Sequence, residues 1–327
     1  MNLGFVGLGN YAINHQRAVQ KNPDLALVSV YDIVPERAEE VAREFGAKRA
    51  PAIEALAGDP DVDGVVITTP NPRHYDDFKV CTAHGKHVFV NVPVTTSRAQ
   101  AVEMMRLAEK HDVTYMAGHN LRKNPAVSYL KRRLDAGDIG TLHSVEASVG
   151  GAAAYGLTPD NWRYHIRNAP LLPFAQMAVV FIDLILDIMG APESIAAFMS
   201  KRDGAGESPD LGAVIGQYAD GRLSYIGASY VSHLGYEITF AGSEARVTWD
   251  SHDENAVTLI GPESRHRETF DRIDEQYEEL AEFAHCAQTG ATPTVNGLDA
   301  CNVAAYFEAI EESVNTGRAV RFRPFDE

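Results

Sequence analysis

The length, composition and charge of the chain exclude several classes of protein. At 327 residues the chain exceeds the size at which one hydrophobic core stops growing, so we expect two domains. A formal net charge of −16 argues against nucleic-acid binding, because neutralising phosphates requires a basic face. Three widely spaced cysteines without a CxxC pair argue against a disulfide framework or a zinc site, so we expect a reducing compartment and no bound metal.

The beginning of the chain and its most apolar stretch argue against export and membrane insertion. The first residues form an apolar run without the basic segment and cleavage site of a signal peptide. The stretch 171–189 is interrupted by Pro173, Gln176, Asp183 and Asp187, whereas a membrane span needs about 20 predominantly apolar residues. We therefore expect a cytoplasmic protein with no membrane partner.

The first third of the chain alternates short apolar runs with helical patterns. The runs do not alternate between apolar and polar residues, as is typical of parallel strands covered on both faces. Their repetition predicts a doubly wound parallel sheet, a Rossmann fold, over residues 1–120. The expected strands are 3–6, 25–31, 64–68, 87–91 and 113–117, and the expected helices are 11–20, 35–45, 73–84 and 97–111.

The remainder, residues 121–327, has a different pattern. A helix at 124–136, a strand at 142–149, an irregular stretch and a helix at 174–189 precede a series of strands. Turn signals separate these strands, so the sequence predicts an open antiparallel sheet in a C-terminal α+β domain. The strands are expected at 193–200, 211–218, 222–231, 236–241, 245–249 and 255–260, followed by helices at 274–289 and 298–316.

A glycine-rich motif, Gly7–Ala12, follows the first strand and opens a helix. Gly7 allows the tight turn, Gly9 lets the backbone approach a pyrophosphate, and Ala12 lets helix and strand pack closely. The helix N-terminus offers N–H groups to the anion. Asp32, about twenty residues past Ala12 at the end of the second strand, can accept hydrogen bonds from a ribose. The motif predicts a nicotinamide-dinucleotide site.

The residues after the second strand favour NAD(H) over NADP(H). The Asp32 carboxylate repels a 2′-phosphate, and no arginine or lysine follows in the segment 33–36. Arg37 lies one helical turn further on, where a side chain can bend back or remain in solvent.

Short motifs in order along the chain resemble the glucose–fructose oxidoreductase/inositol dehydrogenase (Gfo/Idh/MocA) family. They include Gly7–Asn10, Tyr31-Asp32, Thr69-Pro70-Asn71 with His74, Gly85–Val88, Arg122 with Asn124-Pro125, Trp162-Arg163 and Gly317–Val320. The resemblance implies a Rossmann domain, a C-terminal domain with an open antiparallel sheet, and a homodimer or homotetramer. It places His74 near the nicotinamide and extends the expected cofactor contacts to Asn10, Tyr11, Thr69, Pro70, Asn71, Asn91 and Pro93.

The chain departs from the family in the two places that carry the family's chemistry. Where the resemblance implies Glu-Lys-Pro, the chain has Asn91-Val92-Pro93. Aligned on Asp183, the family's catalytic Asp and His fall on Gln176 and Val180. Valine can neither donate nor accept a proton, so the usual proton relay cannot operate through these positions.

Other polar residues are candidates for the missing roles. His165, Tyr164 and His74 are candidate catalytic residues, although each has a structural alternative. Asn91 and Gln176 suit the orientation of a polar substrate but not proton transfer. The expected substrate-binding residues are Asn91, His119, Asn120, Trp162, Arg163 and Gln176.

Three functions remain open at this point. The first is an NAD(P)-dependent oxidoreductase with an atypical site, acting on a small imine, ketone or sugar-like substrate. The second is a catalytically inactive dinucleotide-binding or scaffold homologue, and the third a redox-neutral lyase or isomerase that uses bound NAD.

The C-terminal strands predict self-association. Tyr218, Tyr225, Tyr230 and Phe240 are expected on an uncovered sheet face. A second semi-apolar face needs a partner, so we expect a homo-oligomer, most simply a two-fold dimer that buries this face.

Overall fold

The chain divides into two compact units. The computed structural model describes residues 1–233 and 235–325. The first unit contains Met1–Asn120 and Asp274–Ala304, and the second contains Leu121–Ile273 and Ala305–Glu327. The sequence placed a single boundary after residue 120 and did not reveal that the segment 274–304 belongs with the first unit.

The first unit contains a six-stranded parallel sheet in the order β3-β2-β1-β4-β5-β6. The order reverses between β1 and β4, the arrangement of doubly wound dinucleotide-binding sheets, so the predicted Rossmann topology is confirmed. The strands are β1 (Asn2–Val6), β2 (Ala26–Tyr31), β3 (Lys48–Arg49), β4 (Gly64–Ile67), β5 (His87–Asn91) and β6 (Tyr115–Gly118).

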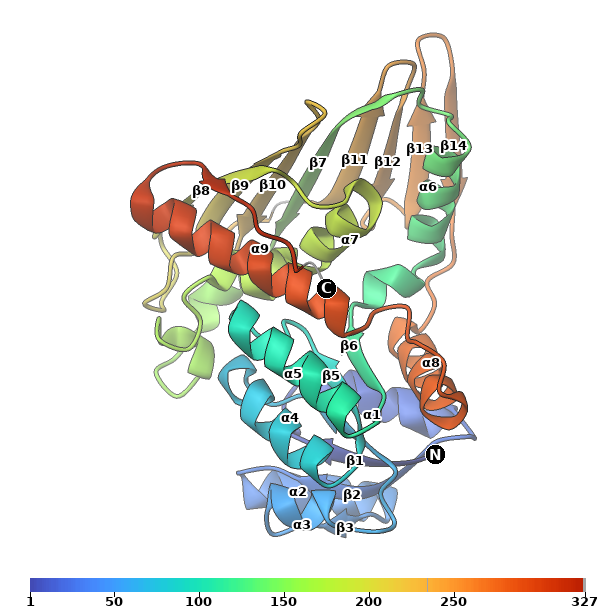
Figure 1. The fold of residues 1–327 in the computed structure, drawn as a ribbon, viewed down its shortest axis with the longest axis vertical. Helices are drawn as coiled ribbons and strands as arrows, with labels where there is room; N and C mark the ends of the chain where they lie inside the picture. The colour runs from blue at the N-terminus through green and yellow to red at the C-terminus, as the bar shows by residue number, and fades with distance from the viewer. Residues whose placement is uncertain (234, 326–327) are drawn as a thin grey trace. The chain divides into compact units, whose positions relative to one another are not determined.

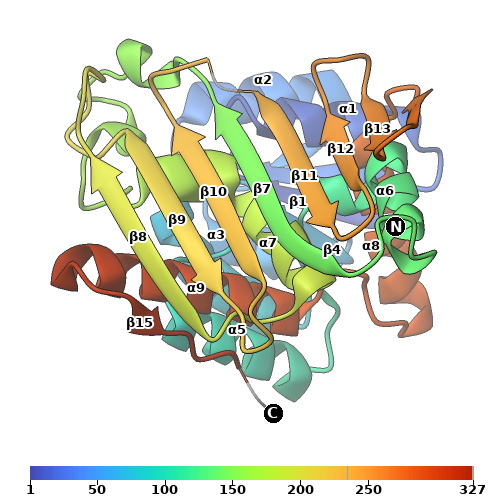
Figure 2. The ribbon, with the colours of Figure 1, turned by 90° about the horizontal axis from the view of Figure 1, so that it is seen from above.

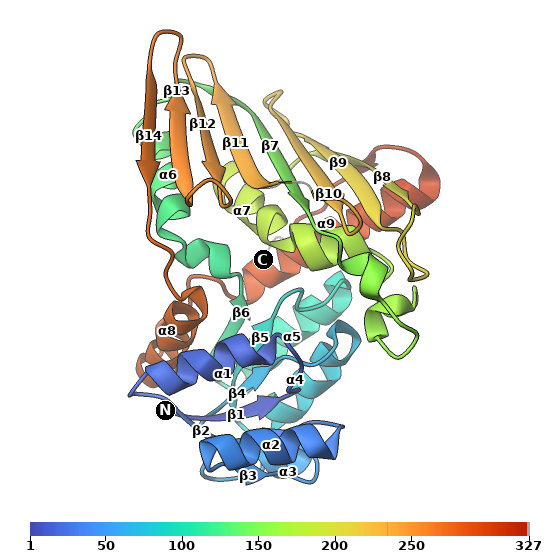
Figure 3. The ribbon, with the colours of Figure 1, turned by 180° about the vertical axis from the view of Figure 1, so that it is seen from behind.

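Helices cover both faces of this sheet (Figures 1 and 3). Three of them, α1 (Ala12–Lys21), α2 (Pro35–Phe45) and α8 (Glu275–Thr289), pack on one face around Phe5, Phe89 and Phe283. The opposite face is covered by α3 (Ile53–Ala57), α4 (His74–Ala83) and α5 (Arg98–Lys110), around Phe78, Met104 and Tyr115. Burial on both faces explains why the central strands read as continuous apolar runs.

The second unit contains a nine-stranded sheet in the order β14-β13-β12-β11-β7-β10-β9-β8-β15. Neighbouring strands are antiparallel except for the parallel pair β7 and β10, a departure from the predicted antiparallel sheet. A parallel pair needs a long crossover connection, and the helices between the two strands are part of it. The strands are β7 (Leu142–Gly150), β8 (Ser194–Ser200), β9 (Leu211–Gln217), β10 (Leu223–Ser229), β11 (Tyr236–Gly242), β12 (Arg246–Asp250), β13 (Ala256–Ile260), β14 (Arg265–Thr269) and β15 (Val320–Arg321).

Helices pack on one face of this larger sheet. They are α6 (Pro125–Asp135), α7 (Val179–Met189) and the end of α9 (Gly297–Thr316). The Phe181 ring of α7 lies 5.0 Å from that of Tyr236, and Ala197 of β8 donates a backbone hydrogen bond of 2.9 Å to Ser313 of α9. Figure 2 looks onto the strands with α7 and α9 behind them.

The other face of the sheet was only partly predicted. Tyr218, Tyr230 and Phe240 are buried within the unit, so their expected exposure is wrong, whereas Tyr225 is 43% exposed. Side chains on a strand alternate between faces, and the sequence pattern did not reveal which face each tyrosine occupies. The exposed apolar residues of this face are Phe198, Ile215, Leu223 and Tyr225, on the adjacent strands β8, β9 and β10.

Short helical turns complete the second unit. The two that carry predicted site residues are η4 (Trp162–Tyr164) and η5 (Phe174–Ala178), a π-helical turn directly before α7. The sequence predicted one helix over 174–189, and the π-turn occupies its beginning. Among the described residues, no helix combines the length and apolarity that crossing a bilayer requires.

Candidate dinucleotide and substrate sites

The glycine-rich turn joins β1 to α1. Gly7 has φ of 84°, and a Cβ there would lie 2.6 Å from the Thr69 backbone nitrogen. Gly9 differs, because a Cβ at that position would meet no atom within 4 Å. The Ala12 amide donates to the Gly9 carbonyl over 2.9 Å, and Ala12 is fully buried. Gly7 is therefore required by the fold, whereas Gly9 borders open space at the start of α1, where the motif predicts a pyrophosphate.

The Asp32 carboxylate holds this turn in place. Its Oδ2 accepts a hydrogen bond of 2.7 Å from the Leu8 amide, and its Oδ1 accepts one of 2.8 Å from the Val34 amide. Arg37 Nη1 lies 4.0 Å from Oδ1 on a side chain that is 56% exposed. A carboxylate has about four lone-pair sites, so both oxygens retain acceptor capacity for the hydroxyls of a ribose.

His74 lies where the ends of β4 and β5 meet. Its Nδ1 is 3.0 Å from the Pro93 carbonyl oxygen, and its Nε2 is 2.7 Å from the Thr69 carbonyl oxygen. The Asn71 side chain donates to the same Pro93 oxygen over 3.0 Å. Burial lowers the pKa of His74, opposed by these carbonyls. Both ring nitrogens face the chain's own backbone, which supports a structural role; a catalytic role stays a prediction.

The end of β5 is the first place where the sequence predicts a departure from the family. Asn91 closes the strand in register with Gly118, and Val92 packs against the apolar cluster under α3, α4 and α5. Of the residues expected after β6, His119 is buried and Asn120 donates a side-chain hydrogen bond to Glu275. Thus, where the resemblance implies a lysine, the chain places a partly buried apolar side chain against its core.

The second unit brings together the predicted residues Trp162, Arg163 and Gln176. Arg163 Nε donates a hydrogen bond of 2.7 Å to Gln176 Oε1, and its guanidinium carbon lies 4.3 Å from the centre of the Trp162 ring. Gln176 belongs to the π-turn η5, and such turns occur frequently at functional sites. Trp162 packs against an apolar cluster that contains Tyr230.

Tyr164 and His165, the candidate acids, follow directly. His165 Nε2 lies 2.8 Å from the Pro159 carbonyl oxygen, and Nδ1 lies 3.6 Å from Glu207 Oε1. The Tyr164 and His165 rings meet edge to face with centroids 5.3 Å apart. Both ring nitrogens of His165 therefore face oxygen atoms of the chain itself. The catalytic role of Tyr164 and His165 stays a prediction.

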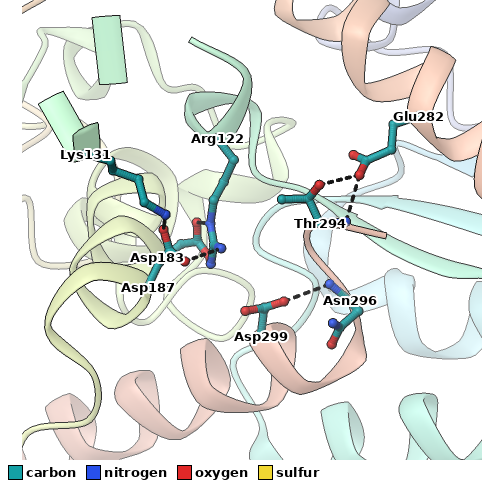
Figure 4. Close-up of polar contacts among 8 residues, drawn as sticks. All are labelled: Arg122, Lys131, Asp183, Asp187, Glu282, Thr294, Asn296 and Asp299. Atoms are coloured by element: carbon teal, nitrogen blue, oxygen red, sulfur yellow. Dashed lines mark hydrogen bonds and ion pairs between the residues drawn. The ribbon is translucent and has the colours of Figure 1, made fainter. Parts of the chain in front are cut away.

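Sequence reasoning missed a network of charged groups between η2 (Asn120–Lys123), α6 and α7, drawn in Figure 4. Arg122 donates to both oxygens of Asp183 over 2.7 and 2.8 Å, and to Asp187 over 2.8 Å. Lys131 also contacts Asp187. Arg122 and Asp183 belong to motifs that the sequence singled out, but their pairing across 61 residues left no local signal.

Figure 4 also shows how polar contacts fix the segment before α9 in the first unit. Thr294 donates to Glu282 of α8, and the Asn296 amide donates to Asp299 over 2.9 Å. Within the part of the chain that the structure describes, no group of three or more His, Cys, Asp or Glu side chains is arranged to hold a metal ion.

Comparison with known proteins identifies the class to which this fold and site belong. Residues 1–119 match the Gfo/Idh/MocA oxidoreductase family model with the NAD-binding Rossmann fold, and residues 127–248 match the Gfo/Idh/MocA C-terminal domain. The chain belongs to the Gfo/Idh/MocA family, as the motifs predicted.

Individual relatives agree with this assignment. An uncharacterised oxidoreductase of Streptococcus pneumoniae is 34% identical over 42% of this chain and 37% of its own length. The myo-inositol 2-dehydrogenase of Thermotoga maritima is 26% identical over 98% of both chains. The structure of levoglucosan dehydrogenase with NADH covers 99% of this chain and 100% of its own, with a TM-score of 0.91 and 20% identity, and so shares the fold.

Proposed function

We propose that this protein is an NAD(P)-dependent oxidoreductase with a rebuilt active site, which transfers a hydride to or from a small polar substrate. One observation carries the proposal: the dinucleotide turn keeps the open space at Gly9 and the engaged Asp32, while positions 92 and 180 carry valine. Decay of an unused protein would be expected to erode both sets of positions. The relative from Thermotoga maritima is a dehydrogenase, which supports the same reaction class.

The residues of the first unit can bind and orient the cofactor. The N-terminus of α1 and the space beside Gly9 would hold the pyrophosphate, and Asp32 would accept from the adenosine ribose. The bound nicotinamide supplies or accepts the hydride. Asp32 favours NAD(H) over NADP(H), because a second negative charge beside the carboxylate is repelled.

The proton that accompanies the hydride needs another route than the usual relay. Val92 and Val180 have no titratable group, so Tyr164 or His165 can supply the proton, or a basic nitrogen of the substrate can take it from water. An imine or a conjugated acceptor suits the second route best. An inactive homologue would also carry valine at these two positions, but it would show no turnover.

The exposed face of the larger sheet supports a proposal on assembly. Phe198 is 71% exposed and Ile215 44% exposed, and Ile215 lies in register with the exposed Tyr225 on the neighbouring strand. We propose that this face pairs in a cytoplasmic homodimer or homotetramer. Light scattering should give at least twice the chain mass of 35.7 kDa, and Phe198→Glu should lower it; a monomer would contradict the proposal.

The experiment on function compares alcohol oxidation with imine reduction. We expect no rapid NADH formation from NAD with myo-inositol or glucose, and NADH consumption with a cyclic imine, whose basic nitrogen takes its proton from water. Val92→Lys alone should leave inositol oxidation absent, whereas the triple change Val92→Lys, Gln176→Asp and Val180→His supplies the whole relay and should raise it.

Two results would contradict the proposal. Fast oxidation of inositol by the unaltered protein would show that the relay is not needed. Tight NADH binding without turnover of any imine, ketone or polyol would favour the inactive homologue. Gly9→Val, which fills the space for the pyrophosphate, is the control that should abolish every cofactor-dependent signal.

A further inference from the structure

Arg163 is a mostly buried cation, and no carboxylate among the described residues pairs with it. Its side chain lies against the Trp162 ring, beside the apolar cluster of Ala154, Leu157, Ala169, Leu172, Tyr230 and Val231. Its side-chain hydrogen bond goes to the neutral Gln176, and the described residues contain no acid in an ion pair with it. Burial lowers the pKa of Arg163, opposed by Tyr230. An arginine cannot escape this cost by losing its proton, so the positive charge persists.

The guanidinium is held on two sides and free on the third. The indole covers one face of its plane, and Gln176 Oε1 fixes the Nε edge. The two terminal nitrogens donate to no acceptor within residues 1–233 and 235–325. A fixed guanidinium with a free edge offers two parallel N–H groups, the geometry that binds a planar oxyanion.

The single positive charge of Arg163 favours an anion with a single negative charge. One guanidinium neutralises one negative charge, which a carboxylate carries. A phosphate monoester carries about −1.5 to −2 at pH 7 and would leave part of its charge uncompensated beside this apolar cluster. Gln176 orients the arginine without neutralising it, so the site keeps its charge for a ligand.

We infer that Arg163 binds the carboxylate of the substrate, so that the enzyme acts on a small organic acid, such as an imino, keto or sugar acid, and not on its neutral counterpart. This inference rests on the proposed function, because it concerns the substrate of that same reaction.

The test is a calorimetric titration of the full chain, with and without NADH, using matched acid and neutral pairs. The pairs are 1-pyrroline-2-carboxylate and 1-pyrroline, 2-oxobutyrate and butanone, and galacturonate and galactose, with inorganic phosphate as a separate arm. We expect at least one acid to bind at least about tenfold more tightly than its neutral partner, which cannot form the charged hydrogen-bonded pair, and than phosphate, whose second charge stays uncompensated.

Three variants assign the binding to Arg163. Arg163→Gln should weaken the acid at least about tenfold. Gln176→Glu should weaken binding of the acid as much, because the new carboxylate would form an ion pair with Arg163 and compete with the ligand. Arg167→Gln removes an equal charge from an exposed position in the same segment and should leave the affinity within about twofold. Trp fluorescence verifies that each variant is folded.

The inference is overturned if no acid binds better than its neutral partner, if phosphate binds as tightly as the acid, or if Arg167→Gln weakens the acid as much as Arg163→Gln does. NADH binding separates the two claims. Loss of acid preference with NADH binding intact rejects this inference alone, whereas acid binding to Arg163 without any NADH binding rejects the proposed function.

Discussion

Two arginines of the second unit, Arg122 and Arg163, are both mostly buried, but only the charge of Arg122 is neutralised by carboxylates of the described residues. Arg122 is 7% exposed in its side chain and is neutralised by Asp183 and Asp187 at 2.7 to 2.8 Å. Arg163 is also mostly buried, but it is oriented by an amide and a ring. The charge of Arg122 is neutralised by the two aspartates, and the ion pairs connect η2 to α7. Arg163 keeps its charge available, which is the property expected of a ligand-binding group.

The largest expected effect is the loss of the compensated pair. Arg122→Leu removes the cation that pairs with both Asp183 and Asp187 in the interior, and breaking a buried pair costs about 3–5 kcal/mol. Urea unfolding followed by tryptophan fluorescence measures this directly, since both tryptophans, Trp162 and Trp249, lie in the second unit. A change below about 1 kcal/mol would show that the network is dispensable.

His15 provides a contrasting case, a buried titratable group that can discharge. Burial lowers its pKa from 6.5 to about 4, so the unfolded chain binds more protons between these values. The stability of the first unit should therefore fall by about 3 kcal/mol as the pH drops from about 6.5 to 4. The melting temperature should therefore change less with pH in His15→Leu than in the unaltered protein. In His84→Gln, a control at an exposed position, it should change with pH as much as in the unaltered protein. Equal slopes for His15→Leu and the unaltered protein would refute the assignment.

The smallest change in the free energy of unfolding is expected when Arg163, whose charge no carboxylate of the described residues neutralises, is removed. Arg163→Leu removes a charge that the fold does not neutralise, so the free energy of unfolding should change by no more than about 1 kcal/mol and can rise. The same urea experiment tests it beside Arg122→Leu. A loss as large as that of Arg122→Leu would place Arg163 in the structural framework and remove the distinction between the two arginines.

The sequence predicted most of what is determined locally. The turn at Gly7 and five of the six strands of the first sheet follow from backbone conformation and burial within a few residues. Strand β14 escaped prediction because all five of its residues are exposed and carry no apolar pattern.

Contacts between distant residues could not be predicted in the same way. The family motifs drew attention to Trp162 and Arg163, and the alignment drew attention to Gln176. That Arg163 donates to Gln176 depends on the π-turn η5, which a helical pattern over 174–189 does not distinguish from an ordinary turn. The burial of Tyr218, Tyr230 and Phe240 likewise depends on which sheet face the helices cover.

The central claim is that the first unit binds a nicotinamide dinucleotide. The most direct test is the melting temperature of the protein with and without NADH or NADPH. The open space at Gly9 and the engaged Asp32 predict that NADH stabilises the protein by about 2.7 kcal/mol at a hundredfold excess over its dissociation constant. Gly9→Val should fold normally, because nothing lies within 4 Å of the new Cβ, yet lose this stabilisation. A melting curve that millimolar NADH and NADPH leave unmoved, or a Gly9→Val variant stabilised as much as the unaltered protein, would contradict the account.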